Sequence, residues 1–198
     1  AEVFSPKTTM RNWLQITGKV LDKESGATNR IVMEWEKTEQ EIAARVASVP
    51  LHKRPKILIM FKTKPMMIGS YGTFGHYWIA RTGGINAADN LKSKHPAMAK
   101  AGSFEEIMQW DPDIVYLSNF ESTMPEDLYQ KRIAGKDWSV IKAVKNKKVY
   151  RLPLGIYRWY PPNLDGPVML KWMAQKNYPH LFDWDIKEEV RAHFSKYY

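Results

Sequence analysis

The sequence of 198 residues contains no cysteine, which excludes disulfide bridges, thiolate metal sites and cysteine nucleophiles. It also lacks any apolar run near the roughly 18 residues that a membrane-spanning helix needs. Residues 1–6 have neither the basic segment nor the apolar core of a secretory signal peptide. We therefore expect the sequence to begin inside a longer protein or after a processed leader.

Motifs for metal, nucleotide and hydrolytic chemistry are missing as well. The segment from Gly69 to Gly75 lacks the Lys-Ser/Thr pair of a P-loop and the spacing of a dinucleotide-binding fingerprint. No serine, histidine and aspartate group into a catalytic set, so we predict no enzyme, no catalytic residue and no cofactor. The histidines form no close metal-binding pair; they are His52, His76, His95, His180 and His193.

Negative charge is scarce relative to positive charge, and the formal net charge is +9. Such a balance suits nucleic acid or an anionic membrane surface. The basic residues are spread along the whole chain, however, and no nucleic-acid reader motif is present. We predict that the chain does not bind nucleic acid and keep a basic surface module as an alternative.

Residues 103–153 carry the clearest structural signal, because they alternate helix, strand, helix and strand. An amphipathic segment leads through a Trp-Asp-Pro-Asp turn into the apolar run at residues 114–117. A second predicted helix at residues 138–144 leads into a strand at residues 149–153. Strands joined by helices pair in parallel, so we predict an α/β fold with a mostly parallel sheet flanked by helices.

The remaining pattern adds helices before and after this region. Residues 27–48 predict a long helix, because small and apolar side chains recur at three- and four-residue steps. That stripe consists of Ala27, Ile31, Trp35, Thr38, Ile42 and Val46. We also expect helices at residues 8–20, 77–81, 168–176 and 186–195, a strand at residues 56–63, and a left-handed helix end at Gly83-Gly84.

Two loops contain side chains that suit a ligand. Residues 157–160 read Tyr-Arg-Trp-Tyr after a predicted strand, where an arginine among aromatic rings can hold an anion and stack on a planar group. The alternative is a loop folded onto the core with Trp159 as a plug. His76 stands beside Tyr71 and Phe74 in a glycine-rich loop. It faces a ligand or, alternatively, caps the helix that begins there.

Four blocks in series resemble the substrate-binding proteins of ABC importers for iron-siderophore, haem and cobalamin. The first block runs from Glu105-Glu106-Ile107 to the turn and strand at residues 111–115. The second block, residues 138–150, reads WSVIKAVKNKKVY. Residues 83–88 (GGINAA) resemble a third block of the family, and residues 172–174 with 178–182 (WMA and YPHLF) resemble its ending.

The resemblance implies a two-lobed protein of which one lobe is present. Residues 1–23 would be a remnant of the N-terminal lobe, residues 24–50 the long inter-lobe helix, and residues 51–198 the C-terminal α/β lobe. The family's N-terminal lobe has no counterpart in this sequence. The implied function is extracytoplasmic or periplasmic capture of a chelated metal, such as a ferric siderophore or haem, by a monomer that delivers it to a membrane permease. Lipid anchoring upstream of Ala1 is an option left open.

The resemblance also assigns roles to residues of the loops at strand ends. The implied ligand contacts are Tyr71, Thr73, Phe74, His76, Asn119, Phe120, Tyr157, Arg158 and Trp159. Asp165 stands where the family presents an acidic residue to the permease, although the usual residue there is glutamate. No metal ligand is predicted, with His76 as the one alternative.

Two other interpretations remain open at this point. The cargo could be a nickel or cobalt chelate or another metal species. The chain could also be an enzyme lobe that holds an anionic substrate through the Tyr-Arg-Trp loop, which would need a base or nucleophile with a shifted pKa nearby.

Overall fold

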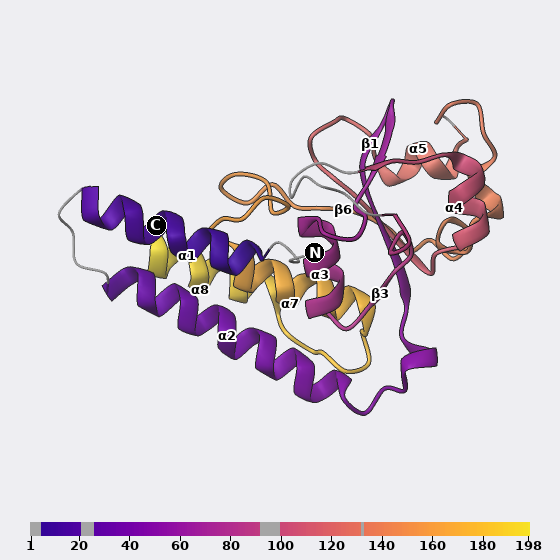
Figure 1. Ribbon diagram of the computed structural model, residues 1–198. Coiled ribbons are helices and arrows are strands. Elements are labelled where there is room, and N and C mark those ends of the chain that lie inside the picture. The colour runs from indigo at the N-terminus through magenta and orange to yellow at the C-terminus, as the bar shows by residue number, and fades with distance from the viewer. Residues whose placement is uncertain (1–4, 21–25, 92–99, 132) are drawn as a thin grey trace.

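The computed structural model describes residues 5–20, 26–91, 100–131 and 133–198 (Figure 1). Its strands form a mixed sheet in the order β4-β2-β1-β5-β6, with β3 paired to the start of β1. The strands are β1 (Lys56–Thr63), β2 (Met66–Ile68), β3 (Ile85–Asn86), β4 (Lys100–Ala101), β5 (Ile114–Leu117) and β6 (Val149–Arg151). β1 pairs in parallel with β3 and β5, and β5 with β6, whereas β2 is antiparallel to β1 and β4. The predicted α/β fold is confirmed.

The predicted helices are present, with ends displaced by up to three residues, and the short helix at Pro125–Tyr129 was not predicted. The helices are α1 (Pro6–Val20), α2 (Gly26–Val46), α3 (Phe74–Arg81), α4 (Phe104–Trp110), α5 (Pro125–Tyr129), α6 (Lys142–Lys145), α7 (Gly166–Asn177) and α8 (Ile186–Tyr197), with short 3-10 turns at Leu51–Lys53 and Trp138–Val140. The helix predicted at residues 138–144 is divided, because Ile141 is extended between the 3-10 turn and α6. The predicted left-handed helix end is present at Gly83, whose φ is 78°.

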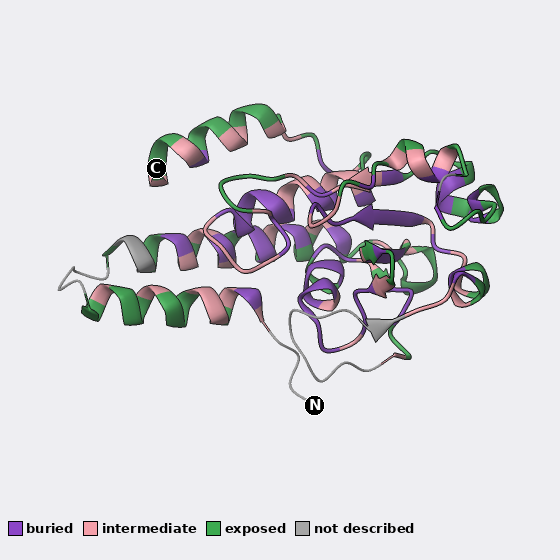
Figure 2. Cartoon of the chain, turned by 90° about the horizontal axis from the view of Figure 1, so that it is seen from above, coloured by how far each residue is buried: buried purple, intermediate pink, exposed green. Residues whose placement is uncertain are grey.

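Alternation along β1 separates the interior into two layers. Ile57 and Ile59 face the cluster that contains residues of α2, α3 and α7, whereas Leu58 and Met60 face the cluster beneath α4. This division follows from the two-residue period of a strand. Figure 2 shows the buried positions concentrated in the strands and in the helix faces turned toward them.

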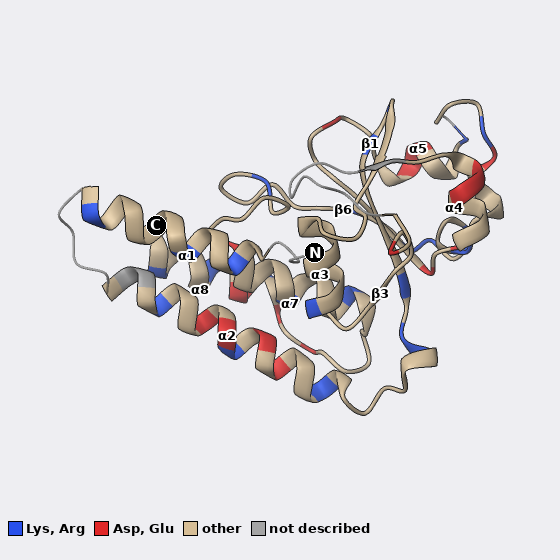
Figure 3. Ribbon diagram, viewed as in Figure 1, with Lys and Arg blue, Asp and Glu red and all other residues tan. Residues whose placement is uncertain are grey.

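The long helix α2 lies along one side of the molecule, with α1 beside it (Figure 1). The predicted stripe is buried at Ile31, Trp35, Thr38, Ile42 and Val46. The Trp35 ring stacks on that of Trp78 in α3, at 5.7 Å between centroids. The opposite face of α2 carries charges of both signs (Figure 3). One face of α2 is therefore part of the core.

The turn between α4 and β5 uses its carboxylates structurally. Asp111 is left-handed, with a φ of 43°, and accepts a hydrogen bond from the Lys142 amide at 2.8 Å. Asp113 accepts one from the Lys56 amide at the start of β1, also at 2.8 Å. Within the described ranges, none of the helices combines the length and apolar character needed to cross a bilayer.

Candidate functional site

The carboxyl ends of β1, β5 and β6 meet at one edge of the sheet, where α/β proteins commonly bind ligands. Three loops leave this edge: residues 69–73 after β2, residues 118–124 after β5 and residues 152–165 after β6. Tyr160 joins the third loop to α3, which directly follows the first loop, because its hydroxyl accepts a hydrogen bond from the Gly75 amide at 3.3 Å. Its carbonyl also accepts one from the Trp78 indole at 2.9 Å. The predicted loops are therefore brought together.

Arg158 joins the second loop to the third. Its Nε donates to the carbonyl of Asn119 at 3.1 Å, and its guanidinium lies 4.7 Å from the centre of the Phe120 ring. The centre of the Tyr157 ring, which is largely exposed, lies 6.0 Å from the guanidinium. Among the described residues, no carboxylate forms an ion pair with this guanidinium. The arrangement is a partly exposed positive charge held against aromatic rings.

The backbone at Arg158 is unusual, because its φ is 49°, in the left-handed region that non-glycine residues seldom occupy. Its carbonyl accepts a hydrogen bond from Asn163 at 2.8 Å, which holds this conformation. Residues kept in such conformations cluster at ligand-binding sites, where surrounding contacts determine them. The strained backbone is therefore a second indication, after the guanidinium held against aromatic rings, that this loop binds a ligand.

Asn119 fastens the loops from inside. Its side-chain amide donates to the carbonyls of Leu152 and Pro153, and only 4% of the residue is exposed. Its Oδ1 is buried without a hydrogen-bond partner among the described residues. The neighbouring Phe120 ring lies 4.9 Å from that of Phe61 in β1. Asn119 therefore supports the loop, while Phe120 backs the guanidinium.

Trp159 is 4% exposed, and its indole lies edge-on to that of Trp172 at 6.2 Å. Its Nε1 donates to Asp165 at 3.1 Å. The structure therefore contains the alternative arrangement, in which the loop folds onto the core and Trp159 fills the space beneath it. As a predicted ligand contact, Trp159 requires correction: it anchors the loop from beneath, because its ring is used in the core.

Asp165 also requires correction. We predicted a surface carboxylate that faces the permease, but this residue is 1% exposed at the start of α7. It accepts hydrogen bonds from the Ile156 amide at 3.0 Å, from the Trp159 indole and from the Tyr198 hydroxyl at 3.1 Å. Burial tends to raise the pKa of Asp165, but His193, the Ile156 amide and the Tyr198 hydroxyl together lower it below the usual value. Asp165 is a buried hydrogen-bond acceptor that shapes the loop.

His76 is not the cap of α3. Thr73 is, since its hydroxyl accepts from the His76 amide at 3.4 Å. The His76 ring lies 4.8 Å from that of Tyr71, and its Nδ1 is 2.9 Å from a carboxylate oxygen of Asp89. Thr73 and Phe74 are buried, which leaves the partly exposed Tyr71 and His76 as the surface of this loop.

No role was predicted for Asp89 or Asn86. Asn86 donates to the Gly69 carbonyl at 3.2 Å, and its amide nitrogen is 3.5 Å from Nδ1 of His76. Both residues belong to or directly follow the GGINAA block, so that block was the available signal. Across the parts of the chain that the structure describes, no three histidine, aspartate or glutamate side chains come together as a metal-binding group.

A family model and a solved structure that match this chain agree on one family. The family model described as "Periplasmic binding protein" matches residues 2–154. A periplasmic solute-binding protein from Veillonella parvula shares the fold with a TM-score of 0.82 and 35% identity, over 95% of this chain and 55% of that one. The predicted resemblance is confirmed.

Two further relatives have a stated ligand. The molybdate-binding protein MolA of Haemophilus influenzae is 26% identical over 164 residues, which is 79% of this chain and 42% of that protein. The nickel–histidine complex of CeuE from Helicobacter pylori has a TM-score of 0.75 at 22% identity, over 95% of this chain and 57% of that one. The chain thus spans about half the length of the relatives that it matches.

Proposed function

The chain belongs to the periplasmic binding protein family, and from this we propose that it is one lobe of a solute-binding protein of an ABC importer. In this proposal residues 1–23 come from the N-terminal lobe, residues 24–50 form the inter-lobe helix and residues 51–198 form the C-terminal lobe. Two observations support this division: relatives are nearly twice as long, and α2 precedes the sheet as a single long helix. The family is one of binding proteins, so the chain is not an enzyme.

The proposed cargo is an anionic metal complex, with a ferric siderophore or haem as the leading candidates. The observation that carries it is the guanidinium of Arg158, which has no carboxylate partner among the described residues and lies against Phe120. An arginine in this setting attracts oxygen-rich anions and stacks on planar groups. An exposed Tyr157 beside it enlarges the aromatic surface.

A nickel or cobalt chelate, or an oxyanion of a metal, is the second candidate. It is favoured by the names of the relatives, which bind molybdate or nickel with histidine. Within this chain, His76 is the residue suited to it, because the Asp89 carboxylate at Nδ1 leaves Nε2 able to act as a ligand.

Delivery to a membrane permease from an extracytoplasmic location completes the proposal. It follows from family membership, and a lipid anchor upstream of Ala1 belongs to the same proposal. The buried Asp165 is not used for docking in this scheme, because its oxygens are already occupied.

Binding is tested on the two-lobed protein by quenching of tryptophan fluorescence. The probes are ferric hydroxamate and ferric catecholate siderophores, haemin, nickel with histidine, and sodium molybdate. We expect micromolar or tighter binding of at least one probe, weakened at least tenfold, or about 1.4 kcal/mol, by Arg158→Ala. Arg191→Ala is the matched control, because Arg191 is an exposed arginine paired with Glu188 on α8. The cargo proposal fails if every probe binds more weakly than about 1 mM.

The probe that binds also distinguishes the two cargo classes. His76→Gln should weaken a nickel–histidine complex by tenfold or more and leave a ferric siderophore nearly unaffected, because only the former needs an imidazole ligand. Loss of siderophore binding in His76→Gln with nickel binding unchanged would reverse this assignment.

A further inference from the structure

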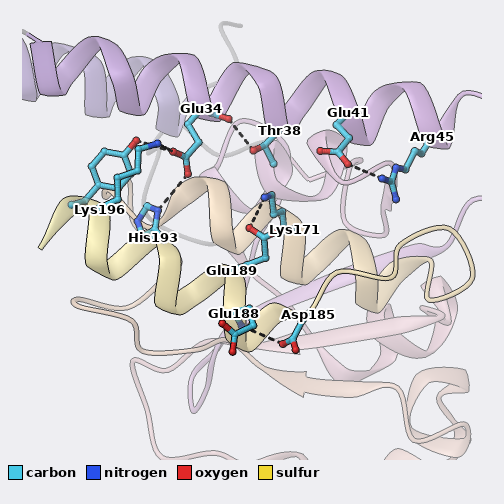
Figure 4. Close-up of polar contacts among 11 residues, drawn as sticks. Glu34, Thr38, Glu41, Arg45, Lys171, Asp185, Glu188, Glu189, His193 and Lys196 are labelled. Atoms are coloured by element: carbon cyan, nitrogen blue, oxygen red, sulfur yellow. Dashed lines mark hydrogen bonds and ion pairs between the residues drawn. The ribbon is translucent and has the colours of Figure 1, made fainter.

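The C-terminal helix α8 returns to the long helix α2 through one carboxylate. Glu34 of α2 accepts hydrogen bonds from Lys196 at 2.5 Å and from the Tyr197 hydroxyl at 2.8 Å. Its other oxygen lies 3.6 Å from Nδ1 of His193 (Figure 4). Three residues from the last two turns of α8 therefore converge on one side chain of α2.

The same end of α8 also contacts the loop that carries Arg158. Nε2 of His193 lies 3.5 Å from Oδ1 of Asp165, which accepts a hydrogen bond from the Tyr198 hydroxyl at 3.1 Å. The second oxygen of Asp165 accepts from the Ile156 amide and the Trp159 indole. One carboxylate thus connects α8 to the residues on both sides of the Tyr157–Arg158 pair.

His193 is the element common to both contacts. Its side chain is 1% exposed, and both ring nitrogens are buried without a direct hydrogen bond among the described residues. Carboxylates lie on opposite sides of the ring, at distances where an ion pair forms but a neutral imidazole gains little. A doubly protonated ring would direct one N–H toward each carboxylate and would balance their buried charge.

The other charged groups near His193 each have an ion-pair partner of their own. Lys196 shares Glu34 with it, and Glu189, one turn earlier on α8, binds Lys171 of α7 at 2.7 Å (Figure 4). The Tyr197 and Tyr198 rings lie 4.9 Å and 6.3 Å from the imidazole. Glu34 and Asp165 are therefore the carboxylates that respond to protonation of this histidine.

We propose that His193 is a positioning residue for the ligand loop, residues 154–162. Its ring lies between Glu34 on one side and Asp165 on the other, so that α8 couples the orientation of α2 to the conformation of the loop. The proposal relies on the proposed function only in naming residues 154–162 a ligand loop and α2 an inter-lobe helix. Loss of the His193 ring loosens Asp165 and, through it, the Ile156 and Trp159 contacts.

The indole N–H of Trp159 reports this directly by NMR, without any ligand. Its signal among the eight tryptophan indoles is assigned with Trp159→Phe. We expect this signal to move in His193→Gln, because Asp165, the acceptor of the indole N–H, loses its neighbour on α8. The signal should keep its wild-type position in His180→Gln, which removes an exposed histidine.

Hydrogen exchange provides a second measurement on the same chain. The Ile156 amide should exchange about tenfold faster in His193→Gln, while amides of the central strand β1 keep their wild-type rates. Glu34→Gln should move the Trp159 indole signal in the wild-type background but not in His193→Gln, because the coupling passes through the histidine.

A purely structural role for α8 predicts a different outcome. His193→Gln would then lower overall stability while the Trp159 signal and the Ile156 exchange rate, relative to β1, stayed unchanged, and the proposal would be overturned. If His193→Gln does not fold, a Trp159 signal that stays unmoved in Glu34→Gln overturns it equally. These results are independent of cargo binding, so failure of the cargo assays would not be mistaken for failure of this coupling.

Discussion

The indole of Trp35 on α2 lies directly against Gly166, the first residue of α7. A β-carbon at position 166 would fall 2.1 Å from Cη2 of that indole. The indole has little freedom to move aside, because it stacks on Trp78 with an angle of 13° between the ring planes. The two helices approach as closely as they do because residue 166 has no side chain.

Replacing Gly166 with alanine should therefore strain the contact between α2 and α7. We expect Gly166→Ala to lower the free energy of unfolding by about 2–3 kcal/mol, because a methyl group is forced into a filled interior. Urea unfolding followed by fluorescence measures the difference. Gly26→Ala is the matched control at the start of α2; its nearest atom would be 3.6 Å away, so a change within about 0.5 kcal/mol is expected.

A double variant tests the stated cause. If Trp35 is the obstacle, Trp35→Leu should remove most of the additional cost of Gly166→Ala, and the two changes should be clearly non-additive. Strict additivity would mean that alanine acts through the α7 backbone and not through the indole.

The buried stripe of α2 was readable from the sequence because helical periodicity depends only on neighbouring residues. The same holds for β1 and β5, whose apolar runs needed no knowledge of their partners. The division of residues 138–144 was not predictable in this way. Ile141 is extended where the chain turns beneath β5, and the amide of Ala143 donates to the carbonyl of Pro112. That constraint comes from a distant segment.

In the candidate site too, features set by neighbouring residues were predictable and features set by distant segments were not. The loop with Arg158 was found because a Tyr-Arg-Trp-Tyr run after a strand is locally unusual. The burial of Asp165 was missed because it depends on His193 and Tyr198, which stand at the far end of the sequence. The burial of Trp159 could not be decided from the sequence for the same reason, since its neighbour Trp172 lies on another element.

The left-handed backbone at position 158 should lower the free energy of unfolding for any residue other than glycine. Both Arg158→Gly and Arg158→Ala lose the contacts with Asn119 and Phe120, but only glycine adopts the left-handed backbone without cost. We expect Arg158→Gly to be more stable than Arg158→Ala by about 0.5–1 kcal/mol in urea unfolding, while both lose cargo affinity equally.

An exposed residue supplies the control for that comparison. Ala134 has a φ of 53° and is exposed, so Ala134→Gly isolates the backbone effect from side-chain contacts. It should be stabilising by a similar amount. A glycine at position 158 that is no more stable than alanine, alongside a stabilising Ala134→Gly, would show that the loop relaxes its backbone once the arginine is removed.

A buried polar chain should be sensitive to loss of one member. The Tyr116 hydroxyl donates to Oδ1 of Asn177 at 2.6 Å, and the Asn177 amide donates to Oγ1 of Thr82 at 3.0 Å. Asn177→Ala removes three buried hydrogen bonds, one with Tyr116 and two with Thr82, and should cost about 2–4 kcal/mol, whereas Tyr116→Phe leaves only Oδ1 of Asn177 without its donor and should cost about 1–2 kcal/mol. Urea unfolding ranks them, and equal costs would indicate that water replaces the lost partners.

Acid should destabilise the fold through Asp165 and Glu34. Burial tends to raise both pKa values, but His193 and hydrogen-bond donors lower that of Asp165 below 3.8, and Lys196 with Tyr197 lowers that of Glu34 below 4.5. A carboxyl whose pKa is lower in the folded state stabilises the fold above its unfolded pKa. That contribution is lost as the pH falls through the folded pKa. Stability should therefore fall steeply below about pH 4.

In Asp165→Asn the free energy of unfolding should change less between about pH 5 and pH 2 than in the wild-type chain. The reason is that the neutral amide has no proton to gain. Asp137→Asn is the control. Lys131 and Ser139 lower the pKa of Asp137 to about 2, but the group is exposed, and solvent screens its ion pair. Its replacement should leave the acid midpoint unchanged within error. A flattened profile in Asp137→Asn together with an unaltered one in Asp165→Asn would show that surface carboxylates, not the buried contact with α8, set the acid stability of the fold.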